Sequence, residues 1–157
     1  MCFIICEKII TFALEYMQKI MTPEIEQRVR ERSENNPYIT FLRIKLLKVE
    51  DGLIEAVMPL TDDQKQYSGV SHGGVLAAFA DTIAGLAAYT KTPLEKDVLT
   101  AEMKISFMRA AWGTTLRAKG YSIKSGRKIH FCECEIYCDE KLVAKASGTF
   151  CVVDPQI

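Results

Sequence analysis

Residues 71–89 form the segment that most limits how this chain can fold. Read as a helix, the segment carries apolar side chains on nearly every face and is rich in alanine and glycine. A helix that is apolar all round is buried on all sides. The rest of the chain is therefore expected to enclose this one helix.

Six strand-like runs are available to enclose it. Residues 41–49 and 53–59 are joined by Asp51-Gly52, which is a strong hairpin signal. Further runs cover residues 101–108, 114–123, 128–138 and 142–153, with short turns between them. These patterns predict an α+β domain in which a curved antiparallel sheet of about six strands wraps around one long central helix.

The first 34 residues are predicted to add helices ahead of this domain, which covers residues 35–157. Residues 1–21 resemble an amphipathic helix, but two acids and two lysines interrupt them, so we expect no membrane span. No signal peptide is expected either. Packing on the domain or on a second subunit is favoured over membrane-surface binding, because the polar face is not rich in Lys and Arg. A second helix should begin at Thr22-Pro23 and end before Asn35-Asn36-Pro37.

The composition is that of one ordinary globular domain. The chain has 157 residues, of which 48% are hydrophobic and 25% charged, so general disorder is excluded. Twenty basic side chains balance 20 acidic ones, and a nucleic-acid binder is not expected. The six cysteines lack the spacing of a secreted disulfide scaffold or a metal site. We expect small, mostly buried thiols in a reducing cytoplasm.

Asp81 is the one carboxylate within the apolar helix. A carboxylate in such surroundings is unfavourable unless it is paired, and aspartate is a poor residue for the middle of a helix. One interpretation gives it a structural role, as a backbone cap or as the partner of an arginine such as Arg109. The other makes it a catalytic base or nucleophile in a dry cleft, and we favour this one.

The sequence His72-Gly73-Gly74 stands at the start of the same helix. Two glycines there leave backbone N–H groups free and let a ligand approach the main chain closely. The helix dipole adds positive potential at the same point. Such a site stabilises an oxyanion that develops on an attacked carbonyl. A tight turn explains these three residues nearly as well, so the functional interpretation rests on their combination with Asp81.

This combination resembles the hot-dog-fold thioesterases, in particular their PaaI-like branch. The resemblance rests on YSGVSHGGVL at residues 67–76, with Asp81 nine residues after His72. It extends to LTAEMKISF at 99–107 and GRK at 126–128, and covers roughly residues 35–153. It implies a hot-dog fold, a sheet wrapped around a helix, and hydrolysis of an acyl-CoA thioester. No metal or separate cofactor is implied, since coenzyme A is part of the substrate.

The resemblance also implies roles for individual residues. Gly73 matches the residue whose backbone N–H polarises the thioester carbonyl, and His72 matches one that shapes the helix start. Asp81 matches the carboxylate that activates water or attacks the carbonyl itself. Thr100 matches a Ser/Thr that helps to hold the attacking water. At Gln66 the family often has asparagine, which contacts the thioester region, so this chain departs from the pattern by one methylene.

Coenzyme A carries a pyrophosphate and a ribose phosphate, so we expect cations around the mouth of the site. Candidates are Arg109, Lys124, Arg127 and Lys128, with arginine favoured for bidentate phosphate contacts. Each of these charges is explained equally well as part of a solvated turn. Gly74 is expected to bring a second stretch of backbone close to the substrate.

The spacing of Gly73 and Asp81 predicts a dimer. The two residues are eight positions apart, or about 12 Å along a helix, whereas a reacting carbonyl must lie about 3 Å from both groups. The Asp81 side chain leans toward the helix N-terminus, but not far enough to close this gap. If both act on one thioester, they come from two chains. We therefore expect an obligate twofold dimer with two shared sites, or a dimer of such dimers.

Other functions remain open within this fold. One is an acyl-CoA-binding or sensing protein without catalysis, although a sensor would need an output domain for which the chain has no room. Others are a thioesterase for acyl-carrier-protein substrates and an enoyl hydratase or dehydratase. The hydratases and dehydratases use a catalytic histidine in settings that neither His72 nor His130 matches, and His130 is expected to be structural.

Overall fold

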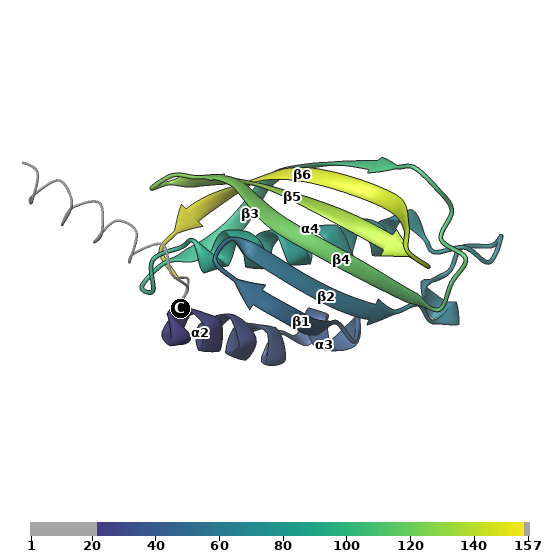
Figure 1. The fold of residues 1–157 in the computed structure, drawn as a ribbon, viewed down its shortest axis with the longest axis horizontal. Coiled ribbons are helices and arrows are strands. Elements are labelled where there is room, and N and C mark those ends of the chain that lie inside the picture. The colour runs from purple at the N-terminus through teal and green to yellow at the C-terminus, as the bar shows by residue number, and fades with distance from the viewer. Residues whose placement is uncertain (1–21, 156–157) are drawn as a thin grey trace, which may run out of the picture.

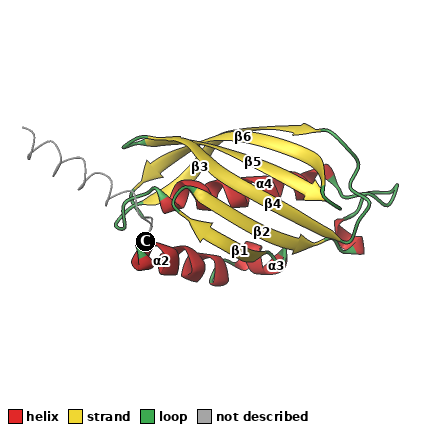
Figure 2. Ribbon diagram, viewed as in Figure 1, coloured by secondary structure: helices red, strands yellow, loops and turns green. Residues whose placement is uncertain are grey.

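The structure, a computed structural model, describes residues 22–155 and consists of one sheet wrapped around one long helix (Figure 1). The strands are β1 (Lys45–Glu50), β2 (Leu53–Pro59), β3 (Asp97–Phe107), β4 (Thr115–Ser125), β5 (Ile129–Cys138) and β6 (Lys141–Val153). The helices are α2 (Pro23–Glu34), α3 (Pro37–Phe41) and α4 (Gly73–Thr90), with a 3-10 turn η1 (Asp62–Gln64). The strand order is β1-β2-β4-β5-β6-β3, and all pairs are antiparallel. The predicted α+β architecture is confirmed, with α4 on the inner side of the sheet (Figure 2).

The β1–β2 hairpin forms at the predicted Asp51-Gly52 turn. Gly52 has φ +73°, a left-handed conformation that glycine adopts without strain. Its N–H donates to the Thr90 hydroxyl oxygen at 2.8 Å, at the last residue of α4. The turn therefore fastens the hairpin to the end of the central helix.

The prediction of a single strand over residues 41–49 is wrong in its first part. Residues 37–41 form α3, and β1 begins only at Lys45. The Asn36 side chain caps α3, because its Oδ1 accepts hydrogen bonds from the N–H groups of Tyr38 at 2.9 Å and Ile39 at 3.2 Å. Pro37 fits the first position of such a helix. The Asn-Pro pair that ends α2 therefore also starts a new helix.

The central helix has two different sides. Phe79 and Ile83 are fully buried against the sheet. Gly120 of β4 allows this close packing, since a Cβ there would lie 2.6 Å from the Ile83 carbonyl oxygen. The opposite side is only half-buried, and its residues are Gly73, Val75, Ala77, Ala78, Asp81, Thr82 and Gly85. By length and composition α4 could cross a membrane, but in this fold it packs against the sheet. The prediction that the helix is buried on all sides is wrong for the single chain.

Three cysteines of β5 share one face of the strand and are buried, as predicted: Cys132, Cys134 and Cys138. Burial raises the pKa of the Cys132 thiol to about 11, so it stays protonated at neutral pH. Cys151 is half-buried, and Cys2 and Cys6 lie outside the described residues, as does the amphipathic segment 1–21. Within residues 22–155, no three His, Cys, Asp or Glu side chains gather as a metal site would require.

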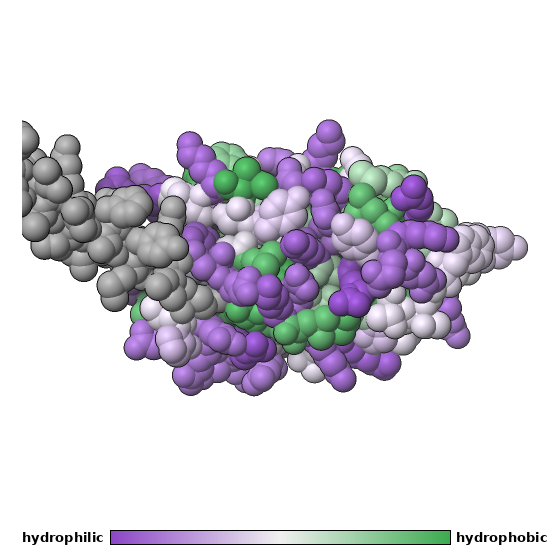
Figure 3. Space-filling model, viewed as in Figure 1, coloured by the Kyte–Doolittle hydropathy of each residue, from purple (hydrophilic) through white to green (hydrophobic). Residues whose placement is uncertain are grey.

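β3 forms one edge of the sheet and is mostly exposed. Its apolar side chains Leu99 and Phe107 are 50% and 53% exposed. A long edge strand carries a row of unpaired N–H and C=O groups, and proteins usually cover or protect such an edge. On the face of the molecule shown in Figure 3, hydrophobic residues form patches that are separated by hydrophilic ones.

Arg28 of α2 caps the C-terminal end of α4. Its guanidinium donates to the carbonyl oxygens of Tyr89, Thr92 and Pro93 at 2.8 to 2.9 Å, and it lies 4.0 Å from the centroid of the Tyr89 ring. The last carbonyls of a helix lack partners within the helix, and a cation there also suits the helix dipole. Arg28 thus fixes α2 to the helix that carries Asp81.

Replacing Arg28 with alanine should lower the free energy of unfolding by about 2–3 kcal/mol, because hydrogen bonds to a charged group typically contribute about 1.5–3 kcal/mol. Urea denaturation measures this loss. Arg30→Ala is the control, since Arg30 pairs with Glu26 at 2.7 Å on the partly exposed surface of the same helix. Its loss should stay below about 0.5 kcal/mol. Equal losses in the two variants would contradict the role of Arg28 as a cap of α4.

Candidate functional site

The start of α4 offers one free backbone amide. His72 is the N-cap residue, and its Nδ1 accepts a hydrogen bond from the Gly74 N–H at 2.9 Å, so the ring proton lies on Nε2. The N–H groups of Val75 and Leu76 donate to the His72 carbonyl oxygen at 3.0 and 3.3 Å. The Gly73 N–H has no acceptor within residues 22–155. The Gly74 N–H is thus engaged by His72, and contact of the Gly74 backbone with the substrate stays a prediction.

The free amide belongs to a residue that lines a hollow of about 400 Å³. Gln66 and Arg109 line the same hollow, so the structure brings three predicted site residues together. The Phe107 ring forms part of the wall beside the helix start, where a Cβ on Gly73 would lie 3.4 Å from it. The remaining lining residues are Val70, Ser71, Leu76, Met108, Ala110 and Ala111.

Asp81 lies about two helical turns further along α4, on the half-buried side. Its Oδ1 accepts a hydrogen bond from the Thr100 hydroxyl at 2.8 Å, so two more predicted site residues are in contact. Arg109 is not the partner of Asp81, because its guanidinium donates to the Leu142 carbonyl oxygen at 3.0 Å. The prediction of a fully buried carboxylate is wrong for the single chain, in which Asp81 is half-buried.

A β-bulge turns Thr100 toward α4. The pairing register of β3 with β6 shifts between Thr100 and Glu102, which leaves Ala101 as the extra residue. The bulge reverses the alternation of the strand: Thr100 faces α4 before it, and Met103 and Ile105 pack on the core after it. The strand predicted from the sequence begins only at residue 101, whereas β3 begins at Asp97, because one irregular residue hides the alternating pattern.

The carboxylate and the free amide belong to different hollows of one chain. Asp81 and Thr100 line a hollow of about 220 Å³ whose lining does not include Gly73 or Gln66. The separation of Gly73 and Asp81 along α4 is about 12 Å. One chain therefore does not present both groups to the same carbonyl, in agreement with the expectation drawn from their spacing.

The predicted phosphate-binding cations are divided between two ends of the molecule. Arg127 and Lys128 are exposed in the β4–β5 turn, and Lys124 is exposed near the end of β4. This turn lies at the end of the sheet where α4 finishes, whereas α4 begins, with Gly73, at the other end, where β3 finishes just before Arg109 (Figure 1). A single chain thus does not place these four cations around one opening.

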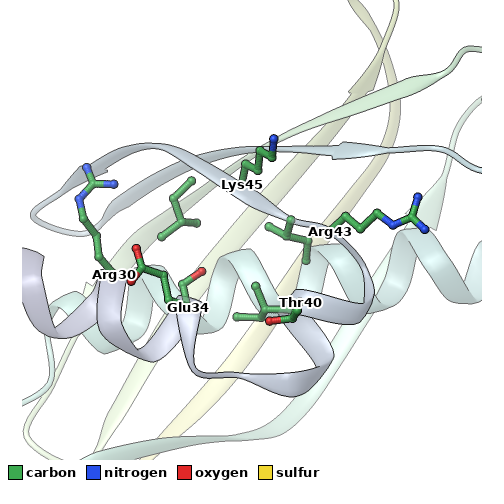
Figure 4. Close-up of a pocket in the computed structure, with 9 residues that line it drawn as sticks. Arg30, Glu34, Thr40, Arg43 and Lys45 are labelled. Carbon is green, nitrogen blue, oxygen red and sulfur yellow. The ribbon is translucent and has the colours of Figure 1, made fainter.

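A further hollow of about 370 Å³ lies between α2, α3 and β1 (Figure 4). Arg30, Arg43 and Lys45 line it, but their charged ends point apart. Arg30 is already paired with Glu26. None of the site residues predicted from the sequence lies here, and the diverging cations do not form an anion site.

His130 is buried in β5, away from both hollows. It is 1% exposed, and its Nε2 lies 3.3 Å from the Thr92 hydroxyl oxygen. Thr92 donates its own proton to the Ala88 carbonyl oxygen at 3.0 Å, so Nε2 is the donor to Thr92. Burial, and secondarily the positive charge of Lys91, hold the pKa of His130 below its ordinary value. These surroundings indicate a structural role for His130.

Lowering the pH should lower the free energy of unfolding, because protonation of His130 is less favourable in the folded state than in the unfolded chain. In the unfolded chain histidine binds a proton near pH 6.5, whereas the folded imidazole binds it only at lower pH. The unfolded state therefore holds more protons below about pH 6.5, and stability falls by up to about 1.4 kcal/mol per pH unit from this group. Urea denaturation between pH 7 and pH 5 measures the slope. The His130→Gln variant should show a flatter slope, and an unchanged slope would contradict this assignment.

Residues 68–145 match the family model described as Thioesterase superfamily. The proofreading thioesterase EntH of Klebsiella pneumoniae is 30% identical over 109 residues, which cover 69% of this chain and 79% of that protein. The 1,4-dihydroxy-2-naphthoyl-CoA hydrolase of Escherichia coli K12 is 30% identical over 103 residues, covering 66% of this chain and 75% of that protein.

The fold has close counterparts among solved structures. The PaaI protein from the phenylacetic acid degradation operon of E. coli matches with a TM-score of 0.80 at 22% identity. The match covers 87% of this chain and 99% of that one. The hot-dog fold expected from the sequence is therefore confirmed.

Proposed function

The chain belongs to the thioesterase superfamily, with the hot-dog fold of its PaaI-like members, and from this premise we propose that it hydrolyses acyl-CoA thioesters at sites shared between two subunits. Family membership accounts for thioester hydrolysis as such. One observation carries the rest of the proposal. The free Gly73 N–H and the Asp81 carboxylate lie on one helix about 12 Å apart, at separate hollows.

At a shared site the Asp81 carboxylate of one chain faces the partner's Gly73. That N–H donates to the thioester carbonyl oxygen and stabilises the oxyanion as it forms. Asp81 takes the proton of the attacking water, or attacks the carbonyl carbon itself and forms an acyl–Asp81 anhydride that water then hydrolyses. In either route the C–S bond breaks, the sulfur takes up a proton from Asp81 or from water, and coenzyme A leaves as the thiol. The Thr100 hydroxyl donates a hydrogen bond to Asp81 Oδ1, so Oδ2 is the oxygen that takes the proton or attacks the carbonyl carbon.

Two features support a twofold dimer as the working unit. The edge strand β3 is 11 residues long and mostly exposed, so it offers a surface for pairing with a second strand. The half-buried side of α4 includes Asp81 and adjoins β3 through Thr100. Pairing two β3 strands across a twofold axis would cover both features at once. We propose this dimer, alone or doubled into a tetramer.

Coenzyme A is the proposed carrier of the acyl group. The E. coli relative is by name a hydrolase of a CoA thioester, which supports this choice. Gln66 and Arg109 share the hollow of Gly73 and are the proposed contacts for the thioester region and a phosphate group. In the proposed assembly the β4–β5 turn reaches the same opening, where Arg127 and Lys128 are further phosphate contacts. The proposal includes no metal and no separate cofactor.

Release of free coenzyme A from a panel of acyl-CoAs, followed with a thiol reagent, tests the proposal. We expect release from several esters by the wild-type protein, and slower release from the same acyl groups on acyl-carrier protein. Binding of acyl-CoA without thiol release from any ester would favour the sensing function instead. Hydration of an enoyl-CoA without thiol release would favour a hydratase.

A further inference from the structure

Within one chain, neither the backbone of residue 85 nor its surroundings explain why this residue is a glycine. Gly85 lies inside α4, where glycine is less favourable than alanine. A Cβ added to it would lie 3.4 Å from the Phe150 ring, which is ordinary van der Waals contact. An alanine therefore fits both the helical backbone and the packing. The missing side chain needs a different explanation.

Gly85 lies one helical turn after Asp81, on the same face of α4. Both residues line the hollow of about 220 Å³ described above. Because residue 85 has no side chain, the space directly beyond the Asp81 carboxylate stays open. The hollow continues there between apolar walls formed by Ile39, Leu86, Val98 and Phe150.

The charges around this hollow disfavour an anionic occupant. Arg32 lines it, but its guanidinium pairs with Asp97 at 2.6 Å and lies 4.4 Å from the centroid of the Tyr89 ring. It therefore offers little free charge to a ligand carboxylate. Apart from Arg32, Asp81 is the only charged residue in the lining, within the part of the chain that the structure describes.

We propose that this hollow holds the acyl group of the substrate, which extends from the thioester at Asp81 across Gly85, and that Gly85 and Tyr38 set its size. The inference rests on the proposed function, since the acyl group is bonded to the carbon that Asp81 acts on. The hollow of Gly73, with Gln66 and Arg109, then belongs to the coenzyme A side. The substrates are apolar acyl groups larger than acetyl.

Tyr38 of α3 is the second size-determining residue. Its side chain is 52% exposed and its ring stacks on Phe41 with 6.1 Å between centroids. Asn36 accepts the Tyr38 N–H and so fixes the start of α3 beside the hollow. Tyr38 lines the hollow, whereas Phe41 does not. Phe41 therefore provides a matched control on the same short helix.

The first test is Gly85→Ala. We expect the melting temperature to rise by about 1–4 °C, because alanine is the better helix residue. At the same time the ratio of kcat/KM for hexanoyl-CoA to that for acetyl-CoA should fall at least about tenfold, since the added methyl group occupies acyl space. A gain in stability combined with a loss of selectivity is not expected from a packing defect.

The second test is Tyr38→Ala against Phe41→Leu, which keeps an apolar side chain beside the Tyr38 ring. Shortening Tyr38 should raise the ratio of kcat/KM for decanoyl-CoA to that for hexanoyl-CoA by about tenfold or more, because the wall recedes. Phe41→Leu should leave this ratio unchanged. The same shift in both variants would overturn the assignment of Tyr38 as a wall of the acyl hollow.

These outcomes separate the inference from the proposed function. A wild-type protein that releases no coenzyme A from any ester contradicts the proposed function itself. A wild-type enzyme that is active, combined with a Gly85→Ala variant that loses the same factor on every ester, overturns only the acyl-site inference. Dissociation of the Gly85→Ala dimer on size-exclusion chromatography would also overturn it, because the glycine would then serve subunit packing.

Discussion

Replacing Asp81 with asparagine should lower kcat/KM for acyl-CoA hydrolysis by about 10²- to 10⁴-fold, the usual contribution of a catalytic carboxylate. Asparagine has nearly the same shape, and its Oδ1 can still accept the hydrogen bond from Thr100. Its amide can neither take a proton from water nor attack a carbonyl carbon. Thiol release measures the loss, and thermal melting shows that the fold is intact.

Glu102→Gln is the matched control for this change. Glu102 is an exposed carboxylate of β3 on the other side of the bulge from Thr100, and it accepts a hydrogen bond from the Thr149 hydroxyl at 3.2 Å. Its replacement should leave kcat/KM within about twofold, because surface polar contacts contribute little. Wild-type activity in Asp81→Asn would remove the carboxylate from the mechanism.

Replacing Gly73 with proline should lower kcat/KM by about 10²- to 10³-fold, as expected for the loss of one oxyanion-hole donor. Proline removes the N–H, and it is well suited to the first position of a helix, where that N–H has no helical partner. The residue before it, His72, already has the extended conformation that proline requires, with φ −67° and ψ 136°. The helix should therefore still form.

Gly73→Ala separates the amide from the side chain. Alanine keeps the N–H, and its Cβ would lie 3.4 Å from the Phe107 ring, an ordinary contact. The loss in this variant should stay below about tenfold. Similar losses in the proline and alanine variants would show that the shape of residue 73, and not its amide, supports the activity.

Much of the fold could be predicted because local signals agree with the final arrangement. The Asp51-Gly52 turn, the apolar helix and the alternating strands each specify their own conformation. α3 was missed because Asn36-Pro37 is a stop signal for one helix and a start signal for the next. The bulge at Ala101 was missed because pairing with β6, which no local pattern contains, decides which face of β3 each residue takes.

The half-buried side of α4 shows a different limit. Apolar side chains predict burial, but they do not indicate whether the same chain or a second one provides the cover. Asp81, Gly73 and Thr100 stood out in the sequence because their residue types are unusual at those positions. Tyr38 did not, because its approach to Asp81 depends on the tertiary packing of α3.

Mixing two inactive variants tests the shared site most directly. Asp81→Asn and Gly73→Pro chains are unfolded and refolded together in equal amounts, and thiol release is compared with that of each variant alone. Random pairing makes about half of the dimers mixed, and each mixed dimer has one site with both native residues, so about a quarter of the wild-type activity should return. If instead the mixture is no more active than the two separate variants, the carboxylate and the amide do not meet across a subunit boundary.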